Sequence, residues 1–258
     1  MEKHKLQISM LAGVVITLLR LFYTVAIITS KEQENLTFRT YYTIPEINNA
    51  TLQQNEPFLK GFTPLIKEYY NLHYSTILFV EAALTSGFYI LGYAFFDRFV
   101  SITTKYNNLF FQFFVYSISA PMFYVCTLML CGMVNGVSLI TLGVMMAILQ
   151  YNGAVIFMEN GINSYFMNTN LLISGCLLFI ALMLPLCIQF KLATDENTPP
   201  SFVYWLFSLL ILFYTSFGVV MIVSNYYMYD IKKISVLYII LDISSKIAIS
   251  ACLLQIYF

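Results

Sequence analysis

The chain has 258 residues, of which 59% are hydrophobic, 17% aromatic and only 10% charged. Soluble domains usually carry about 25% charged residues, so this composition excludes an ordinary soluble protein and indicates an all-α, polytopic membrane protein. The 13 basic and 13 acidic side chains cancel, which gives no reason to expect a nucleic-acid partner.

Seven apolar stretches are long enough to cross a lipid bilayer, whose core needs roughly 20 residues of helix. We expect spans at residues 7–29, 75–96, 109–131, 136–158, 170–190, 202–225 and 235–257. The first stretch is too long for the core of a signal peptide, so it is predicted to be a retained helix. The whole chain, 1–258, is therefore predicted to form one seven-helix membrane domain.

The long loop at residues 30–74 and the distribution of basic residues predict the orientation. The loop holds two glycosylation-type sequons, Asn35-Leu36-Thr37 and Asn49-Ala50-Thr51, which matter only if it lies outside. With the N-terminus inside, Lys and Arg gather close to the inner span ends. We therefore predict a multi-pass protein of the plasma membrane or an endomembrane, with a cytoplasmic N-terminus, an extracellular loop and an extracellular C-terminus.

Ionisable residues inside the spans are expensive to insert, at roughly 2.5–3.5 kcal/mol each, and they usually mark function. Four of them remain once the loop charges are set aside: Arg20, Glu81, Asp242 and Lys246. Asp242 and Lys246 are four residues apart and so share one helix face, which must point into the bundle. Three interpretations of Lys246 are open. It could be half of an inert ion pair, it could bind a transported ion, or its amine could form a Schiff base with an aldehyde.

Other signals of chemistry are missing from the sequence. Nucleotide-binding, zinc-protease and serine-hydrolase motifs do not occur, so an enzyme is not expected. The cysteines lie in apolar stretches without a CxxC pair, and we expect unpaired thiols and no metal site; they are Cys126, Cys131, Cys176, Cys187 and Cys252.

Three segments resemble the heliorhodopsin family of retinal proteins. The last span reads Tyr238-Ile-Ile-Leu-Asp-Ile-Ser-Ser-Lys246, similar to the family's Tyr-Ile-Val-Leu-Ser-(x)3-Lys. The sixth span contains Pro200-Ser-Phe-Val-Tyr204 and Phe213-Tyr-Thr-Ser-Phe217, at the spacing of the family's Pro-Gly-Phe-Val-Tyr and Phe-Phe-Asn-Ser-Phe. The third span has Val115-Tyr-Ser-Ile-Ser119 where the family has Glu-Tyr-Ser-Leu-Ser.

This resemblance implies a seven-helix, rhodopsin-like bundle of inverted topology that binds all-trans-retinal as a protonated Schiff base on Lys246. The family's usual counterion is the glutamate of the third span, which is Val115 here, whereas the family's seventh-span serine is Asp242. We therefore predict that Asp242 is the counterion. The resemblance also places further residues around the chromophore: Tyr116, Ser119, Met122, Phe213, Tyr214, Phe217 and Tyr238.

Glu81 and Arg20 are predicted to lie at similar depth in the outer halves of the first two spans. They could be a mutual ion pair, which is costly to break because one charge would be stranded. Alternatively, Glu81 could be a proton acceptor, a second counterion or part of an ion path.

The sequence thus predicts a light-sensing photoreceptor that acts on an unidentified signalling partner, and the family resemblance implies a homodimer in the lipid bilayer. The main alternative is a light-gated ion or proton channel or transporter with the same chromophore. The second is a retinal-free membrane transporter or receptor in which Asp242 and Lys246 form only an ion pair.

Overall fold

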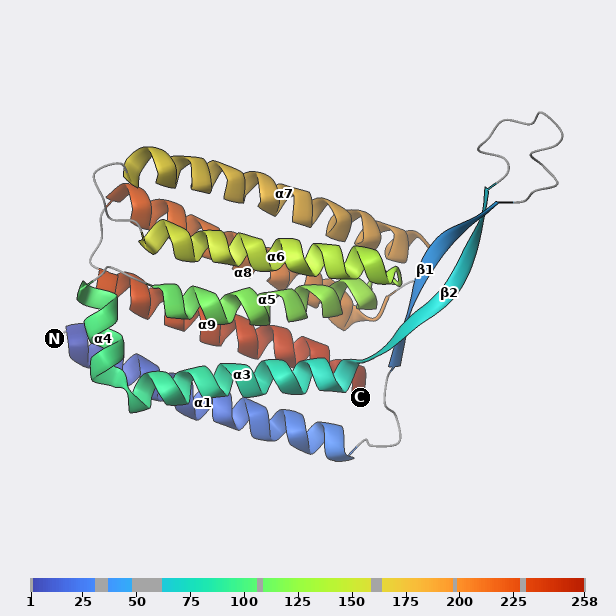
Figure 1. Cartoon of the computed structure of the whole chain (residues 1–258). Helices are drawn as coiled ribbons and strands as arrows, with labels where there is room; N and C mark the ends of the chain where they lie inside the picture. Colours follow the sequence, from blue (N-terminus) through green and yellow to red (C-terminus); the bar gives the residue numbers. More distant parts are fainter. Residues whose placement is uncertain are drawn as a thin grey trace.

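The computed structural model describes residues 2–30, 37–47, 62–105, 109–158, 164–196, 199–227 and 231–257. Seven of the described helices are long and apolar enough to cross a membrane, and they run side by side in one bundle (Figure 1). They are α1 (Glu2–Ser30), α3 (Tyr74–Ala94), α5 (Phe110–Leu130), α6 (Gly136–Met158), α7 (Ser164–Glu196), α8 (Ser201–Tyr227) and α9 (Ile231–Leu254). The predicted all-helical, seven-span fold is confirmed.

The predicted spans and the observed helices differ mainly in length. The helix α7 exceeds its predicted span, 170–190, at both ends, and α1 begins at Glu2 rather than at residue 7. These three extensions consist largely of polar residues, which a search for apolar runs leaves out. After α3 the chain turns at Phe95 into a short helix, α4 (Phe96–Lys105), and a single 3-10 turn, η2 (Gln255–Tyr257), follows α9.

Part of the long loop between α1 and α3 is a β-hairpin that the sequence analysis did not predict. Strand β1 (Thr37–Ile47) pairs antiparallel with β2 (Phe62–His73), from Thr37 opposite His73 to Ile47 opposite Phe62. Both strands are rich in Thr, Tyr, Phe and Ile, which favour extended backbone. The sequon asparagines Asn35 and Asn49 lie outside the described residues.

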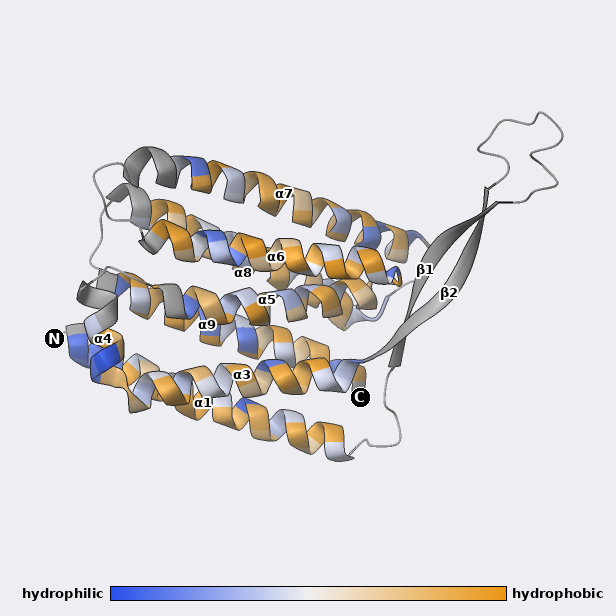
Figure 2. Cartoon of the chain, viewed as in Figure 1, coloured by the Kyte–Doolittle hydropathy of each residue, from blue (hydrophilic) through white to orange (hydrophobic). Residues whose placement is uncertain are grey.

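The bundle is apolar on its outside and carries its polar side chains inside, the reverse of a soluble protein. Figure 2 shows hydrophobic residues along all seven long helices. Exposed side chains include Leu19, Phe22 and Trp205, between 64% and 68% accessible. Hydrocarbon offers no hydrogen-bond partners, so such residues face lipid and polar residues turn inward. The buried polar set includes Thr17, Glu81, Thr85, Ser86, Gln112, Ser235, Asp242, Lys246 and Ser250.

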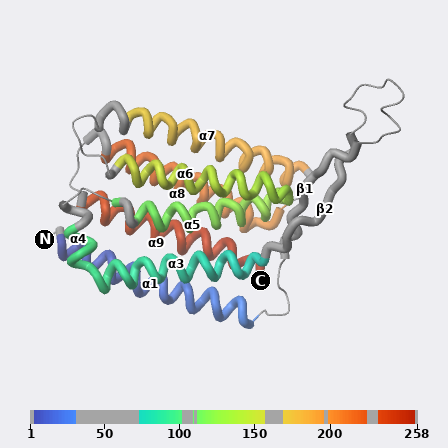
Figure 3. The backbone as a smooth tube through the Cα atoms, viewed as in Figure 1, coloured from blue at the N-terminus to red at the C-terminus, as the bar shows by residue number. Residues whose placement is uncertain are grey.

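The helix α9, which carries Asp242 and Lys246, packs against helices on two sides. It packs against α1 and α8, and α1 also packs along α3. On the other side of the bundle, α5 packs on α6 and α6 on α7; Figure 3 traces the same order along the backbone. The two ends of the chain lie at opposite ends of the bundle, as an odd number of spans requires (Figure 1). The cytoplasmic location of the N-terminus stays a prediction.

Candidate functional site

The buried face of α9 holds Asp242 and Lys246 in direct contact. The Nζ atom of Lys246 is 2.9 Å from Oδ1 of Asp242, and the two side chains are only 4% and 3% exposed. The four-residue spacing brings the side chains together one helical turn apart, as the sequence predicted. Within this turn, the hydroxyl of Ser245 donates a hydrogen bond of 2.9 Å to the backbone carbonyl of Asp242.

The second carboxylate oxygen of Asp242 is bonded to a residue that the sequence analysis missed. The hydroxyl of Tyr89, on α3, donates a hydrogen bond of 2.8 Å to Oδ2 of Asp242. Tyr89 follows Glu81 and Thr85 at intervals of four residues, so all three lie on one face of α3. That spacing from an intramembrane glutamate is the sequence signal that could have identified Tyr89.

Glu81 and Arg20 join the same group of charges. Arg20, on α1, forms an ion pair with Oε2 of Glu81, whose side chain is completely buried. Oε1 of Glu81 lies 4.0 Å from Nζ of Lys246 and accepts a hydrogen bond of 2.9 Å from Thr85. Glu81 is therefore paired with Arg20 and also stands beside Lys246, while its role as a proton acceptor, second counterion or part of an ion path stays a prediction.

Arg20, Glu81, Asp242 and Lys246 therefore form one charge cluster, drawn from α1, α3 and α9, whose two positive and two negative charges cancel. Each cation also lies near an aromatic ring. The guanidinium carbon of Arg20 is 5.6 Å from the Phe123 ring centre, and the Lys246 nitrogen is 5.5 Å from that of Tyr116. Such contacts stabilise cations by about 0.5–2 kcal/mol. Mutual pairing and these rings are what make four buried ionisable groups tolerable in a membrane.

A small cavity of about 30 Å³ reaches the same lysine from the side of α5 and α8. Tyr116, Ser119, Tyr214 and Phe217 line it together with Asp242 and Lys246. The ring centroid of Phe217 lies 5.5 Å from that of Tyr116 and 5.8 Å from that of Tyr238, and these three rings form an aromatic wall. Lys246 therefore faces charges on one side and an aromatic wall on the other.

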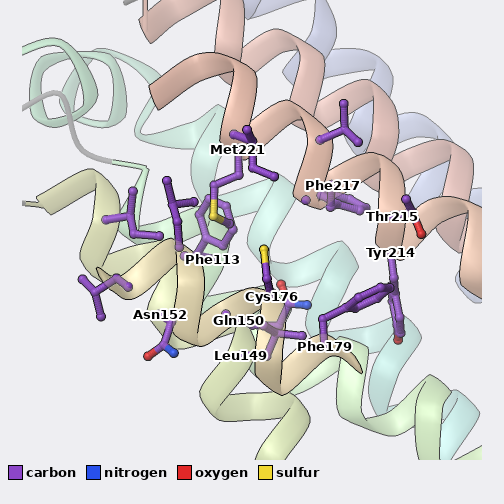
Figure 4. A pocket seen from close by; sticks show the side chains of 18 of the residues that line it. Phe113, Leu149, Gln150, Asn152, Cys176, Phe179, Tyr214, Thr215, Phe217 and Met221 are labelled. Atoms are coloured by element: carbon purple, nitrogen blue, oxygen red, sulfur yellow. The ribbon is translucent and has the colours of Figure 1, made fainter. Parts of the chain in front are cut away.

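A larger cavity of about 330 Å³ adjoins this one between α6, α7 and α8, with α5 at its edge. Figure 4 shows Phe113, Phe179, Tyr214 and Met221 around it. The two cavities share three lining residues, Gln150, Tyr214 and Phe217. Ligand sites in proteins are mostly apolar with few polar groups and span about 300–1,000 Å³. The larger cavity thus has the size and the apolar lining of a ligand site, and Lys246 lines the small cavity next to it.

Two predicted chromophore contacts lie elsewhere. Met122 is half-buried and lines neither of these cavities, whereas its neighbour Phe123 lines the small one. The reason is helix periodicity, since Phe123 is seven residues after Tyr116 and returns to the same face, while Met122 does not. Phe213 also lines neither cavity, but it packs against a buried cluster that includes Phe123 and Ile249 of the small cavity's lining. The remaining predicted residues, Tyr116, Ser119, Tyr214, Phe217 and Tyr238, lie beside the lysine or the aromatic wall next to it.

Comparison with known families identifies the architecture. The heliorhodopsin family model matches residues 10–255 of the chain. The protein belongs to the heliorhodopsin family. It is accordingly a retinal-binding, light-responsive, integral membrane protein. Its third-span position that usually carries the family's glutamate is the half-buried Val115, so the carboxylates described near Lys246 come from α3 and α9.

Solved structures agree on the fold. The thermophilic rhodopsin of Rubrobacter xylanophilus is 15% identical, with a TM-score of 0.68 over 99% of this heliorhodopsin and 95% of that chain. A light-driven proton pump from Leptosphaeria maculans is 12% identical, with a TM-score of 0.67 over 98% and 94%. Cyanorhodopsin from Calothrix sp. is 10% identical, with a TM-score of 0.67 over 97% and 94%. A search of curated proteins found no match.

The ion pair of Arg20 with Glu81 predicts that replacing one partner destabilises the protein more than replacing both. Glu81→Gln should destabilise the protein by about 3–5 kcal/mol, because Arg20 loses its ion-pair partner in a buried site. Arg20→Met combined with Glu81→Leu should cost less than Glu81→Gln alone. Thermal unfolding of purified, detergent-solubilised protein measures both.

Asp97→Asn is the matched control, since it breaks the exposed ion pair with Lys3, which should contribute at most about 1 kcal/mol. If Glu81→Gln unfolded at the same temperature as Asp97→Asn, the pairing of Glu81 with Arg20 would have no energetic importance.

Proposed function

We propose that this heliorhodopsin is a light sensor in which retinal is joined to the amine of Lys246 as a protonated Schiff base, with Asp242 as its main counterion. The observation that carries this proposal is the position of Lys246, which belongs to the charge cluster and also lines the small cavity that adjoins the larger apolar one. Retinal, when bound, supplies light absorption and isomerisation. The chain supplies the attachment, the compensating charges and the shape of the cavity.

Charge balance supports a positively charged nitrogen at Lys246, and distance supports Asp242 as its counterion. A protonated nitrogen at Lys246 keeps the single positive charge that the lysine carries, so the cluster remains neutral with or without the linkage. The nearest carboxylate oxygen to that nitrogen is Oδ1 of Asp242, at 2.9 Å. At short range in a medium of low dielectric constant, this separation decides which carboxylate interacts most strongly.

Glu81 is the second carboxylate of the proposed site. Its Oε1 lies 4.0 Å from the nitrogen, and its charge is shared with Arg20 and with the Thr85 hydroxyl. Glu81 should therefore stabilise the positive nitrogen more weakly than Asp242 does. It is also placed to become the dominant partner whenever the contact between Lys246 and Asp242 is lengthened.

The contacts of the cluster offer a route from the lysine to other helices. Tyr89 and Glu81 link the site to α3, and Arg20 links it to α1. A displacement of the Lys246 nitrogen changes the balance between its two carboxylates and hence the forces on α1 and α3. This coupling favours a signalling output; the alternative of light-gated conduction and the predicted homodimer stay predictions from the sequence.

The proposed attachment predicts a visible absorption band. Protein expressed with all-trans-retinal should absorb in the visible range, and Lys246→Ala should lack that band because it has no amine at the junction. Lys233→Ala, which removes an exposed lysine of the same helix, should keep the band. Absence of a visible band from folded wild-type protein would overturn the proposal and favour the retinal-free alternative.

The two carboxylates should differ in their effect on that band. In Asp242→Asn the band should disappear at a lower pH than in wild type, because the positive nitrogen loses its nearest opposite charge. Glu81→Gln should act in the same direction by a smaller amount, owing to the longer distance. Spectrophotometric titration of both variants measures the order, and a larger effect of Glu81→Gln would make Glu81 the main counterion.

A further inference from the structure

Tyr89 is fully buried where α1, α3 and α9 meet. Its ring belongs to an apolar cluster with Leu6 and Met10 of α1 and Ile239 of α9, and Phe88 packs edge-on against it at 5.4 Å. Its hydroxyl points to Asp242, to which it donates the 2.8 Å hydrogen bond. The two oxygens of this carboxylate thus have different partners, Tyr89 on Oδ2 and Lys246 on Oδ1.

The ring of Tyr89 rests directly on the backbone of α1 at Gly13. A Cβ atom at Gly13 would lie 2.3 Å from Cδ1 and 2.5 Å from Cε1 of the ring, closer than real Cβ contacts occur. The contact is therefore possible only because residue 13 has no side chain.

Hydrogen bonds one turn away fix the two helices at this contact. The hydroxyl of Ser86, on α3, donates to the backbone carbonyl of Thr17 at 3.0 Å. Thr17 in turn donates to the carbonyl of Gly13 at 2.7 Å. Ser86 and Thr17 are both buried, so these bonds set the alignment of α1 and α3 from inside the bundle. The place of the Tyr89 ring is thus set by α1 as well as by its own helix.

We infer that Tyr89 is a positioning residue for the counterion, and that Gly13 holds Tyr89 in place. By bonding Oδ2, Tyr89 fixes the carboxylate of Asp242 with Oδ1 toward Lys246 and withdraws part of its negative charge. This role rests on the proposed function of Asp242 as counterion. It makes the α1–α3 contact a determinant of the colour of the protein and of its response to acid.

Ionisable side chains reach the neighbourhood of Asp242 from several helices. They are Arg20 of α1, Glu81 and Tyr89 of α3, Tyr116 of α5, Tyr214 of α8 and Lys246 of α9 itself. Tyr116 donates its own hydrogen bond to the backbone carbonyl of Tyr238 at 3.4 Å, and Tyr214 donates to that of Ala120 at 2.9 Å. Of these three tyrosines, Tyr89 is therefore the one whose hydroxyl is bonded to the carboxylate of Asp242.

Tyr89→Phe removes the hydroxyl and keeps the ring. In the retinal-loaded protein the visible maximum should move to shorter wavelength, because the more concentrated negative charge on Oδ1 holds the positive nitrogen more strongly. The acid-induced change of the visible spectrum should also occur at a different pH, because the carboxylate beside the positive nitrogen loses a hydrogen-bond donor. A purely structural role of the ring would leave both properties unchanged.

Gly13→Ala tests the contact between residue 13 and the Tyr89 ring without altering a polar group. The methyl group added at residue 13 should displace the Tyr89 ring, so both spectral properties should change in the same direction as in Tyr89→Phe. In the double variant, Gly13→Ala should add no spectral change to that of Tyr89→Phe. Gly87→Ala is the matched control on α3, since a Cβ at Gly87 meets nothing within 4 Å. Gly13→Ala also serves if Tyr89→Phe does not fold.

Infrared spectra of the retinal-free protein supply a readout that does not depend on the chromophore. The carboxylate stretching band that Asp242→Asn removes should shift in Tyr89→Phe and in Gly13→Ala, and stay unchanged in Gly87→Ala. A coloured wild type whose visible and infrared spectra are both unaffected by these variants would overturn the role of Tyr89 and leave the proposed function intact. A colourless wild type would overturn the proposed function and with it the assignment of Tyr89 to a counterion.

Discussion

Four ionisable side chains buried in a membrane-spanning bundle are the constraint on which the rest of this structure depends. Lipid cannot solvate them, so each must find its partner inside the protein. Arg20, Glu81, Asp242 and Lys246 do so by meeting at one place, where their charges cancel. Because the four residues come from α1, α3 and α9, their pairing also fixes how these three helices pack.

The cluster divides the bundle into two functional halves around Lys246. The helix α3 supplies the carboxylate of Glu81, the hydroxyl of Thr85 and the phenol of Tyr89, and α1 supplies Arg20 as the partner of Glu81. The helices α5 to α8 supply the larger cavity, most of the aromatic wall and, with α9, the small cavity. A cation at the end of an apolar ligand needs both halves, since its charge must be compensated while its body is kept from water. Lys246 faces both halves, which is why we propose it as the place of attachment.

Much of this was predictable because the signals are local in sequence. Apolar runs locate the seven spans, and the cost of intramembrane charge selects Arg20, Glu81, Asp242 and Lys246. The contact of Asp242 with Lys246 follows from helix geometry alone. The presence of Val115 in place of the third-span glutamate, together with Asp242 in the seventh span, is also visible in the sequence.

What the sequence did not predict depends on how helices pack against one another. The closeness of Glu81 to Lys246, the bond from Tyr89 to Asp242 and the contact of Tyr89 with Gly13 all join separate helices. Helix rotation decides that Phe123 rather than Met122 lines the small cavity. The β1–β2 hairpin was not predicted because prolines and charged residues interrupt the Thr, Tyr and Ile residues that favour its strands.

The most direct test of the central claim is to locate the chromophore on the chain. Borohydride treatment of the retinal-loaded protein adds a hydride to the carbon of the protonated imine, whose nitrogen already carries its proton, and so converts the linkage to a stable secondary amine. Peptide mapping by mass spectrometry should then find the retinyl group on the α9 peptide that contains Lys246. A retinyl group on another lysine, or on none in a protein that absorbs visible light, would contradict the account.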